Sequence, residues 1–356
     1  MRDRKRGLGL RVSRGAAAAA AAALGCAALA ACSSSSSATS APAGGAGSAP
    51  ASAAGSSAPG MTTVRVGANL NAGTLATYVG IDEGFFAKHN LDVKLTSVLN
   101  LTLIPSQLGK QFDFGQSVQP IAIHAAMSGL PVVVTGGGEV ESPDFIDGGV
   151  IVKKSAGINN AKGLEGKKIA VLTATGNNAY ALKYWMKSQG ANPASVTLEV
   201  VAPNNMIAEL AAGQVDAIYA VSPFAAQALG NSAYKMLVNP EIELGAEVSQ
   251  GTVTISNKDW AASHKDVVLQ FEEAQQDAIA WIKANPDKAL TILDKYTGSK
   301  SAADTKLPTV TATENADDLQ VWLKVMKEVV PGFSTTLTPT ALIDQPIDTA
   351  SYNPQP

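Results

Sequence analysis

Thiols and histidines are scarce in this chain of 356 residues, which has two cysteines and three histidines. Cys26 lies within an apolar N-terminal run and Cys32 ends it, so the remainder offers no thiol for a disulfide, a metal or a nucleophile. His89, His124 and His264 are scattered, and we expect each to be structural. No Gly-x-Ser-x-Gly elbow, phosphate loop or paired-histidine motif occurs. The sequence therefore predicts no catalytic residue, no metal and no cofactor.

Arginine is also rare, because five of the six arginines lie in the first 14 residues and Arg65 is the only other one. Bidentate recognition of a sulfonate, phosphate or carboxylate is thus available at one position at most. An anionic ligand would otherwise depend on helix N-termini, hydroxyls, amides or lysines. The formal net charge of −3 becomes −8 without the six basic residues and one aspartate of the first 31 residues. A nucleic-acid partner is not expected at that charge.

The first 32 residues have the order of a bacterial lipoprotein signal. A basic start precedes an apolar run from Gly15 to Ala28, which is short for a membrane span, and Leu29-Ala30-Ala31-Cys32 follows. We predict that residues 1–31 are a signal peptide and that Cys32 becomes a lipidated N-terminus on the outer face of the cell membrane. An uncleaved anchor helix is the alternative. Residues 32–62 are uncharged and rich in Ser, Ala, Gly and Pro, which predicts a flexible tether with a reach of roughly 30 Å.

Predicted strands and helices alternate along most of the remaining chain. A first series has strands at 64–68, 91–95, 112–115 and 130–135, with helices at 74–88, 104–110 and 120–128. A second series has strands at 167–172, 196–201 and 215–220, with helices at 177–189 and 206–212. After 251–255 the pattern becomes that of amphipathic helices, at 265–284, 287–296 and 314–329, and the tail from 331 is expected to pack as irregular chain over the first lobe. Such alternation predicts βαβ units and an α/β fold with mostly parallel sheets.

The two series predict two lobes, each a sheet flanked by helices. We expect lobe one to comprise residues 63–148 and 254–356 and lobe two to comprise residues 149–253, with crossings near 147–152 and 250–255. Open α/β sheets bind ligands beyond the carboxyl ends of their strands. Two facing lobes therefore predict a ligand cleft that closes by hinge motion.

The run VGIDEGFFAKHNLDV at 79–93 resembles the opening motif of solute-binding proteins of ABC importers, in the nitrate/sulfonate/taurine and thiamine-pyrimidine precursor group. Further similarity follows in the same order, at 112–115, 164–171, 210–217 and 280–287, so the resemblance covers about 64–296. It implies a two-lobed, type II-like periplasmic-binding-protein fold. It also implies a monomer that delivers a small polar organic solute to a membrane permease and its ATPase.

Two other functions stay open at this stage. One is that of a THI5-like pyrimidine synthase, an enzyme that shares the fold but resembles cytosolic proteins with a cysteine-rich motif absent here. The other is that of an extracytoplasmic sensor, which would present its solute to a receptor instead of a permease.

Polar residues follow the predicted strands where the cleft is expected. In the family, the loop at 173–178 often holds the polar head of the solute, and its helix N-terminus would point positive dipole character into the cleft. Capping or a simple turn is the alternative at each position. The substrate-binding candidates in these loops are Asn69, Asn71, Thr74, Gln116, Ser117, Thr175, Gly176, Asn177, Asn178 and Ser222.

An acidic stretch occupies the predicted first crossing, with Glu139, Glu141, Asp144 and Asp147. A solvated loop is the plain interpretation. A carboxylate that entered the cleft would favour a cationic or hydrogen-donating solute and oppose a sulfonate or nitrate. We take Glu139 as the candidate, and the class of solute stays open between the sulfonate, nitrate or taurine type and the pyrimidine type.

Overall fold

The computed structural model describes residues 60–140, 145, 147–244, 251–301, 305–345 and 352–354. The signal peptide, Cys32 and nearly all of the tether lie outside the described residues, as do Glu141 and Asp144. Among the described helices, none is long and apolar enough to cross a membrane.

The first sheet has five strands in the order β2-β1-β3-β11-β4. These are β1 (Thr62–Ala68), β2 (Leu91–Ser97), β3 (Phe114–Ser117), β4 (Val132–Gly136) and β11 (Val253–Asn257). β1 pairs in parallel with β2 and β3, whereas β11 is antiparallel to β3 and β4. The predicted strands of the first series are therefore confirmed, and one late strand lies between two early ones.

The second sheet has the order β10-β6-β9-β7-β8. Its strands are β6 (Gly148–Lys153), β7 (Lys168–Val171), β8 (Thr197–Val200), β9 (Ala217–Val221) and β10 (Tyr234–Val238). β7 is parallel to β8 and β9, and β6 is antiparallel to β9 and β10. Each sheet thus has one antiparallel strand among five, which confirms the α/β fold with mostly parallel sheets. A small third sheet pairs β5 (Glu139–Val140) with β12 (Thr309–Val310).

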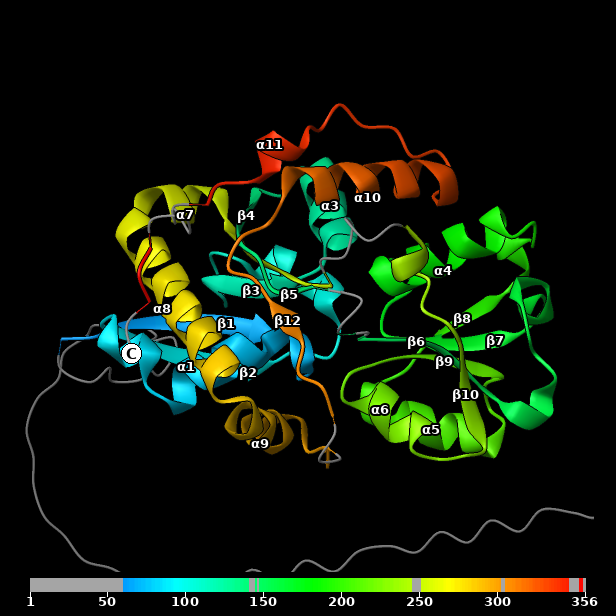
Figure 1. The fold of residues 1–356 in the computed structure, drawn as a ribbon. Helices are drawn as coiled ribbons and strands as arrows, with labels where there is room; N and C mark the ends of the chain where they lie inside the picture. The colour runs from blue at the N-terminus through cyan, green and yellow to red at the C-terminus, as the bar shows by residue number, and fades with distance from the viewer. Residues whose placement is uncertain are drawn as a thin grey trace, which may run out of the picture. The chain divides into compact units, whose positions relative to one another are not determined.

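Helices cover both faces of each sheet (Figure 1). On the first sheet, α1 (Leu75–Asp82), α2 (Phe85–Lys88), α8 (Lys265–Ala284) and α9 (Pro286–Thr297) share one apolar cluster, and α3 (Gln119–Met127) and α10 (Ala316–Val329) share another. On the second sheet, α4 (Asn177–Ser188) packs on one face, with α5 (Pro203–Ala212) and α6 (Phe224–Leu229) on the other. The short helices α7 (Lys258–Ser263) and α11 (Pro339–Leu342) complete the described set.

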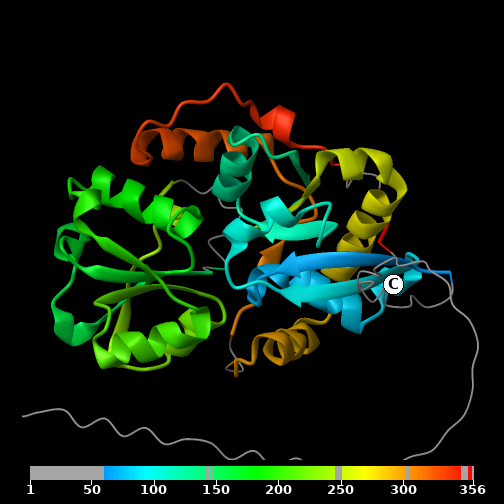
Figure 2. The ribbon, with the colours of Figure 1, turned by 180° about the vertical axis from the view of Figure 1, so that it is seen from behind.

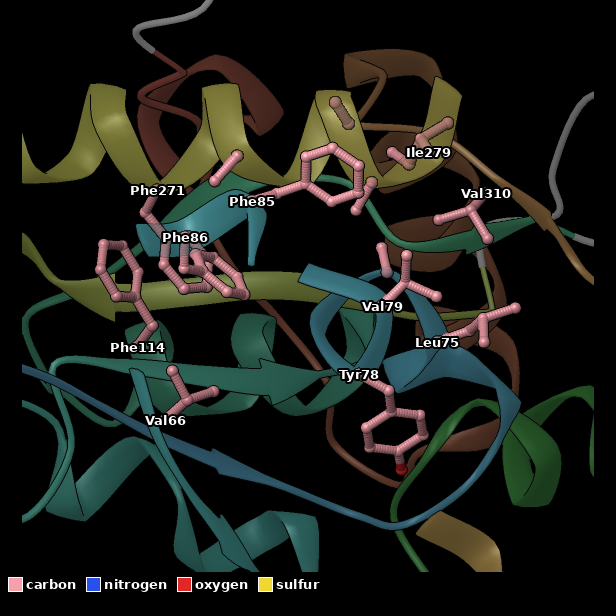
Figure 3. Packing of buried hydrophobic residues seen from close by; sticks show 14 of the residues in the cluster. Val66, Leu75, Tyr78, Val79, Phe85, Phe86, Phe114, Phe271, Ile279 and Val310 are labelled. Carbon is pink, nitrogen blue, oxygen red and sulfur yellow. The ribbon is translucent and has the colours of Figure 1, made fainter. Parts of the chain in front are cut away.

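Three phenylalanines stack at the centre of the first of these clusters. The rings of Phe114 and Phe271 lie 4.1 Å apart between centroids, and those of Phe86 and Phe271 lie 5.0 Å apart. Figure 3 shows this stack between the sheet and α8, with Val66 and Val79 nearby. Burial of such large apolar side chains is the main favourable term in folding, so α8 is held firmly on the first sheet.

Two helix predictions were wrong in detail. The predicted helix at 104–110 is replaced by two single 3₁₀ turns, Leu101–Leu103 and Pro105–Gln107, because the backbone is extended at Leu108 and Gly109 has a left-handed φ of 73°. The predicted helix at 74–88 is divided into α1 and α2 at Gly84, which has a left-handed φ of 76°. The strand β10 and the helix α6 were not predicted.

α10 spans the two sheets, because it packs against α3 of the first and α4 of the second (Figure 2). Lys187 on α4 forms a salt bridge of 2.7 Å with Glu328 on α10. The side chain of Trp322 on α10 is completely buried. The chain after α10 continues along the first sheet, where Ile343 forms an isolated bridge with Val134.

Candidate functional site

A cavity of about 30 Å³ is lined by loops from both sheets. Asn71 follows β1, Thr173 follows β7 and Val221 ends β9, so the cavity lies at the carboxyl ends of parallel strands. Its polar lining consists of Asn71, Glu139, Asp147, Thr173, Asn177, Asn178 and Thr252. We call this cavity the cleft.

A larger hollow of about 250 Å³ adjoins the cleft, and the two share Ile121. It is lined by Pro105, His124 and Leu130 from the first lobe and by Thr175 from the second. We call it the mouth. Nearby, the ring of His124 on α3 is hydrogen-bonded at 2.7 Å to the hydroxyl of Tyr180 on α4. Loops and helices of both lobes therefore surround the space in which a solute could sit.

The amide groups of Asn177 and Asn178 are engaged by a buried carboxylate, that of Glu241. Asn177 Nδ2 donates to both carboxylate oxygens at 3.2 Å, and Asn178 Nδ2 donates to Oε1 at 2.9 Å. Tyr219 Oη donates to the same oxygen at 3.2 Å. Burial and the nearby charge of Asp147 raise the pKa of Glu241 to about 7, in spite of these hydrogen bonds.

Asp147 lies on the cleft beside Glu139. Its Oδ1 accepts a hydrogen bond of 2.9 Å from the backbone N–H of Ser222, and its side chain is hydrogen-bonded to that of Glu139. Burial raises the pKa of Asp147 to about 6. Two carboxyl groups joined in this way share a proton, because both cannot ionise cheaply at such short range.

A buried network supports the first-lobe side of the cleft. Asn69 donates through its backbone N–H to Gln116 Oε1 at 2.8 Å, and Gln116 Nε2 donates to Asn71 Oδ1 at 3.0 Å. The backbone N–H of Glu139 donates to Thr252 Oγ1 at 2.8 Å. Because each of these groups has a partner, the orientations of the side chains of Asn71 and Thr252 are well defined.

The predicted site residues fall into three groups. Asn71, Glu139, Asn177 and Asn178 line the cleft, and the exposed Thr175 lines the mouth. Gln116 and Thr74 line a separate first-lobe cavity, while Asn69 supports them from behind. The remaining predicted residues, Ser117, Gly176 and Ser222, line none of these spaces.

The three that line no cavity have structural positions. Ser117 is completely buried and its hydroxyl donates to the carbonyl of Val118 at 3.3 Å. Gly176 is the N-cap of α4, where an added Cβ would approach Thr173 Oγ1 to 2.3 Å. Ser222 accepts a backbone hydrogen bond of 3.3 Å from Ala72, across the two lobes. Solute contacts of all the predicted residues stay predictions.

Sequence reasoning did not identify Glu241, Tyr219 or Thr252 as parts of the site. Glu241 follows β10, and that strand was not predicted, so the loop at its carboxyl end was not considered. Asp147 was noted in the acidic stretch but was not chosen as a candidate. In the part of the chain that the structure describes, no group of three or more His, Cys, Asp or Glu side chains could hold a metal ion.

The family model described as NMT1/THI5 like matches residues 71–289, from the first cleft loop to the start of α9. The chain belongs to this family. Among solved structures, the alkanesulfonate-binding protein SsuA from Xanthomonas axonopodis pv. citri bound to MOPS is 16% identical, with a TM-score of 0.66, over 82% of this chain and 100% of that one. The periplasmic nitrate-binding protein NrtA from Synechocystis PCC 6803 is 14% identical, with a TM-score of 0.66, over 80% and 86%. These likenesses show that this chain has the two-lobed fold of those binding proteins.

Two curated relatives match parts of the chain. A Bacillus subtilis (strain 168) protein named for the binding of aliphatic sulfonates is 29% identical over 141 residues, which is 40% of this chain and 41% of that protein. A Haemophilus influenzae protein named for thiamine biosynthesis is 25% identical over 230 residues, 64% of this chain and 70% of that protein. The match thus spans less than half the length of the first relative.

Proposed function

We propose that this NMT1/THI5-like protein is the extracytoplasmic substrate-binding protein of an ABC importer. It holds a small polar organic solute between its two lobes and delivers it to a permease and its ATPase. The observation that carries the proposal is the cleft at the carboxyl ends of both sheets, with polar side chains from both lobes around it. The similar folds of proteins named for alkanesulfonate and nitrate binding support it.

The proposal includes binding without chemistry. The buried polar groups of the cleft are joined to one another in hydrogen bonds, as suits a rigid recognition surface. The alternative of a pyrimidine-synthase-like enzyme draws support from the relative named for thiamine biosynthesis. A sensor that presents the solute to a receptor would need the same cleft.

We further propose that Cys32 carries lipid and holds a monomer at the outer face of the cell membrane. The support is the sequence order of a basic start, an apolar run and Leu29-Ala30-Ala31-Cys32. The tether of residues 32–62 would let the body reach a permease in the same membrane.

A thermal-shift screen of small metabolites tests the proposed function. A solute that binds only the native state stabilises it by about 2.7 kcal/mol at a hundredfold excess over Kd. Mass spectrometry of the released hit should return the same compound after hours with the protein. Turnover of the hit would instead establish an enzyme, and loss of import on deletion of a neighbouring permease would separate importer from sensor.

A further inference from the structure

We propose that the solute held in the cleft is an organic cation that carries an ammonium or amidinium group. This inference rests on the proposed solute-binding function and specifies its substrate class. It differs from the anions in the names of the sulfonate-binding and nitrate-binding proteins of similar fold.

Acidic groups surround the cleft. The carboxyl groups of Glu139 and Asp147 line it, and that of Glu241 lies directly behind Asn177 and Asn178. All three acidic side chains are more than nine-tenths buried. Full ionisation of carboxyl groups that share a proton in a buried cluster is costly, and a cation that enters between them offsets that cost.

The side-chain amides of Asn177 and Asn178 in the second lobe also present hydrogen-bond acceptors to the cleft. The Nδ2 groups of Asn177 and Asn178 donate to Glu241, so the amide oxygen on the other side of each planar group is left for a ligand. At α4, these oxygens and the carboxylate behind them oppose the positive dipole character that the helix N-terminus would otherwise offer to an anion. A group rich in N–H donors would instead find complementary partners.

Basic side chains are missing from this lining. Among the described residues that line the cleft and the mouth, there is no lysine or arginine. Arg65 is engaged elsewhere, since its guanidinium donates to both carboxylate oxygens of Asp113, at 3.0 Å and 2.5 Å. A sulfonate or nitrate would therefore enter the cleft without a cationic partner.

A second cavity of about 30 Å³ in lobe one supplies an independent observation, and it shares Thr252 with the cleft. Glu272 and Gln275 on α8 line it and are 1% and 8% exposed. The Oε1 atom of each accepts no hydrogen bond from the described residues. Burial raises the pKa of Glu272 well above its usual range, so that carboxyl group can carry a proton, whereas the amide oxygen of Gln275 is an acceptor and is left for an N–H group of a ligand or for water that bridges to it.

The mouth indicates that the cation is organic. Its volume of about 250 Å³, next to the much smaller cleft, leaves room for a carbon skeleton beyond the charged group. Pro105, Ile121 and Leu130 give it an apolar side that suits such a skeleton.

Matched probes test the charge of the solute by thermal shift of the full-length expressed protein in mild detergent. Putrescine, choline and benzamidine are compared with their neutral counterparts 1,4-butanediol, 3,3-dimethyl-1-butanol and benzamide, with ethanesulfonate and nitrate, and with Mg²⁺. A broad metabolite library sorted by charge accompanies them. We expect hits among organic cations only.

The outcomes distinguish failure of the organic-cation inference from failure of the solute-binding function on which it rests. Hits confined to anions, to neutral compounds or to Mg²⁺ would overturn the organic-cation inference and leave solute binding or ion binding standing. A library without any hit would overturn the solute-binding function together with the inference.

Variants then connect the hit to the cleft. Glu139→Gln should weaken the binding of a cationic hit at least tenfold, as expected for loss of a charge-assisted contact. Glu243→Gln is the matched control, because Glu243 is exposed on the loop that follows Glu241 and should leave affinity unchanged. Equal affinities for wild type, Glu139→Gln and Asp147→Asn, with the melting curves intact, would show that the carboxyl groups of the cleft do not recognise the solute.

Discussion

Replacement of Glu241 by glutamine should stabilise the empty protein at alkaline pH and have little effect at acidic pH. Burial and the charge of Asp147 raise the pKa of Glu241 to about 7 from an ordinary 4.5. Each pKa unit corresponds to about 1.4 kcal/mol, so the charged form destabilises the fold by up to roughly 3 kcal/mol. Part of that energy belongs to the pair with Asp147, and we expect about 2 kcal/mol for Glu241 alone.

The sign of the pH dependence follows from proton binding. The folded state holds the proton of Glu241 more tightly than the unfolded state, because its folded pKa is the higher one. The stabilisation is complete below the unfolded pKa, declines as the pH rises towards 7, and is lost above it. Glutamine cannot ionise and resembles the protonated acid, so Glu241→Gln should remove this decline.

Thermal melts at pH 5 and pH 8 measure the effect. With a conversion of about 2 °C per kcal/mol for a large domain, Glu241→Gln should raise Tm by roughly 4 °C at pH 8. The control Glu243→Gln should change Tm equally at both pH values. A Glu241→Gln variant that is destabilised to the same extent at pH 5 and pH 8 would refute the assignment of a titrating buried carboxyl group.

Five other substitutions test three separate parts of the molecule. Cys32→Ser should move the protein out of the membrane fraction or leave a precursor, and it should abolish palmitate labelling; label that persists would exclude this anchor. By calorimetry, Asn177→Ala, Gln116→Ala and Thr175→Ala should each weaken solute binding by about 0.5–1.5 kcal/mol, or by about 1.5–3 kcal/mol if the partner group is charged. Unchanged affinity in all three variants would show that the site lies elsewhere. Phe271→Ala should cost about 3–5 kcal/mol in chemical denaturation, and a loss under about 1 kcal/mol would contradict its central place in the aromatic stack.

Much of the fold could be predicted because hydrophobic period and helix signals agree along the chain. The helix at 265–284 has the same bounds as α8, where a regular amphipathic pattern ends just before Asn285-Pro286. The prediction failed at 104–110, where the backbone is extended at Leu108 and left-handed at Gly109, and at β10, a five-residue strand with little periodicity. Short elements depend on pairing partners that are far away in the sequence.

In the candidate site, too, residues that follow from local sequence patterns could be predicted, whereas residues that depend on distant contacts could not. Loops after predicted parallel strands, such as those of Asn71 and Asn177, could be found because strand ends meet at one edge of a sheet. Glu241 could not be found, since its approach to Asn177 depends on β10 and on the folding of its following turn. Its role became visible only through contacts between residues more than 60 positions apart.

The position of β11 has a consequence for the order in which the protein can fold. β11 pairs with β3 and β4, although it lies more than a hundred residues later in the chain. α8, which covers the same sheet, follows β11 in sequence. The second sheet, in contrast, is complete within 148–238 and can assemble as soon as that stretch has been synthesised. The first sheet must wait for the C-terminal part of the chain, because contacts between distant residues close slowly and late. During synthesis from the N-terminus, lobe one therefore stays open until β11 and α8 have been made, when the second sheet is already complete.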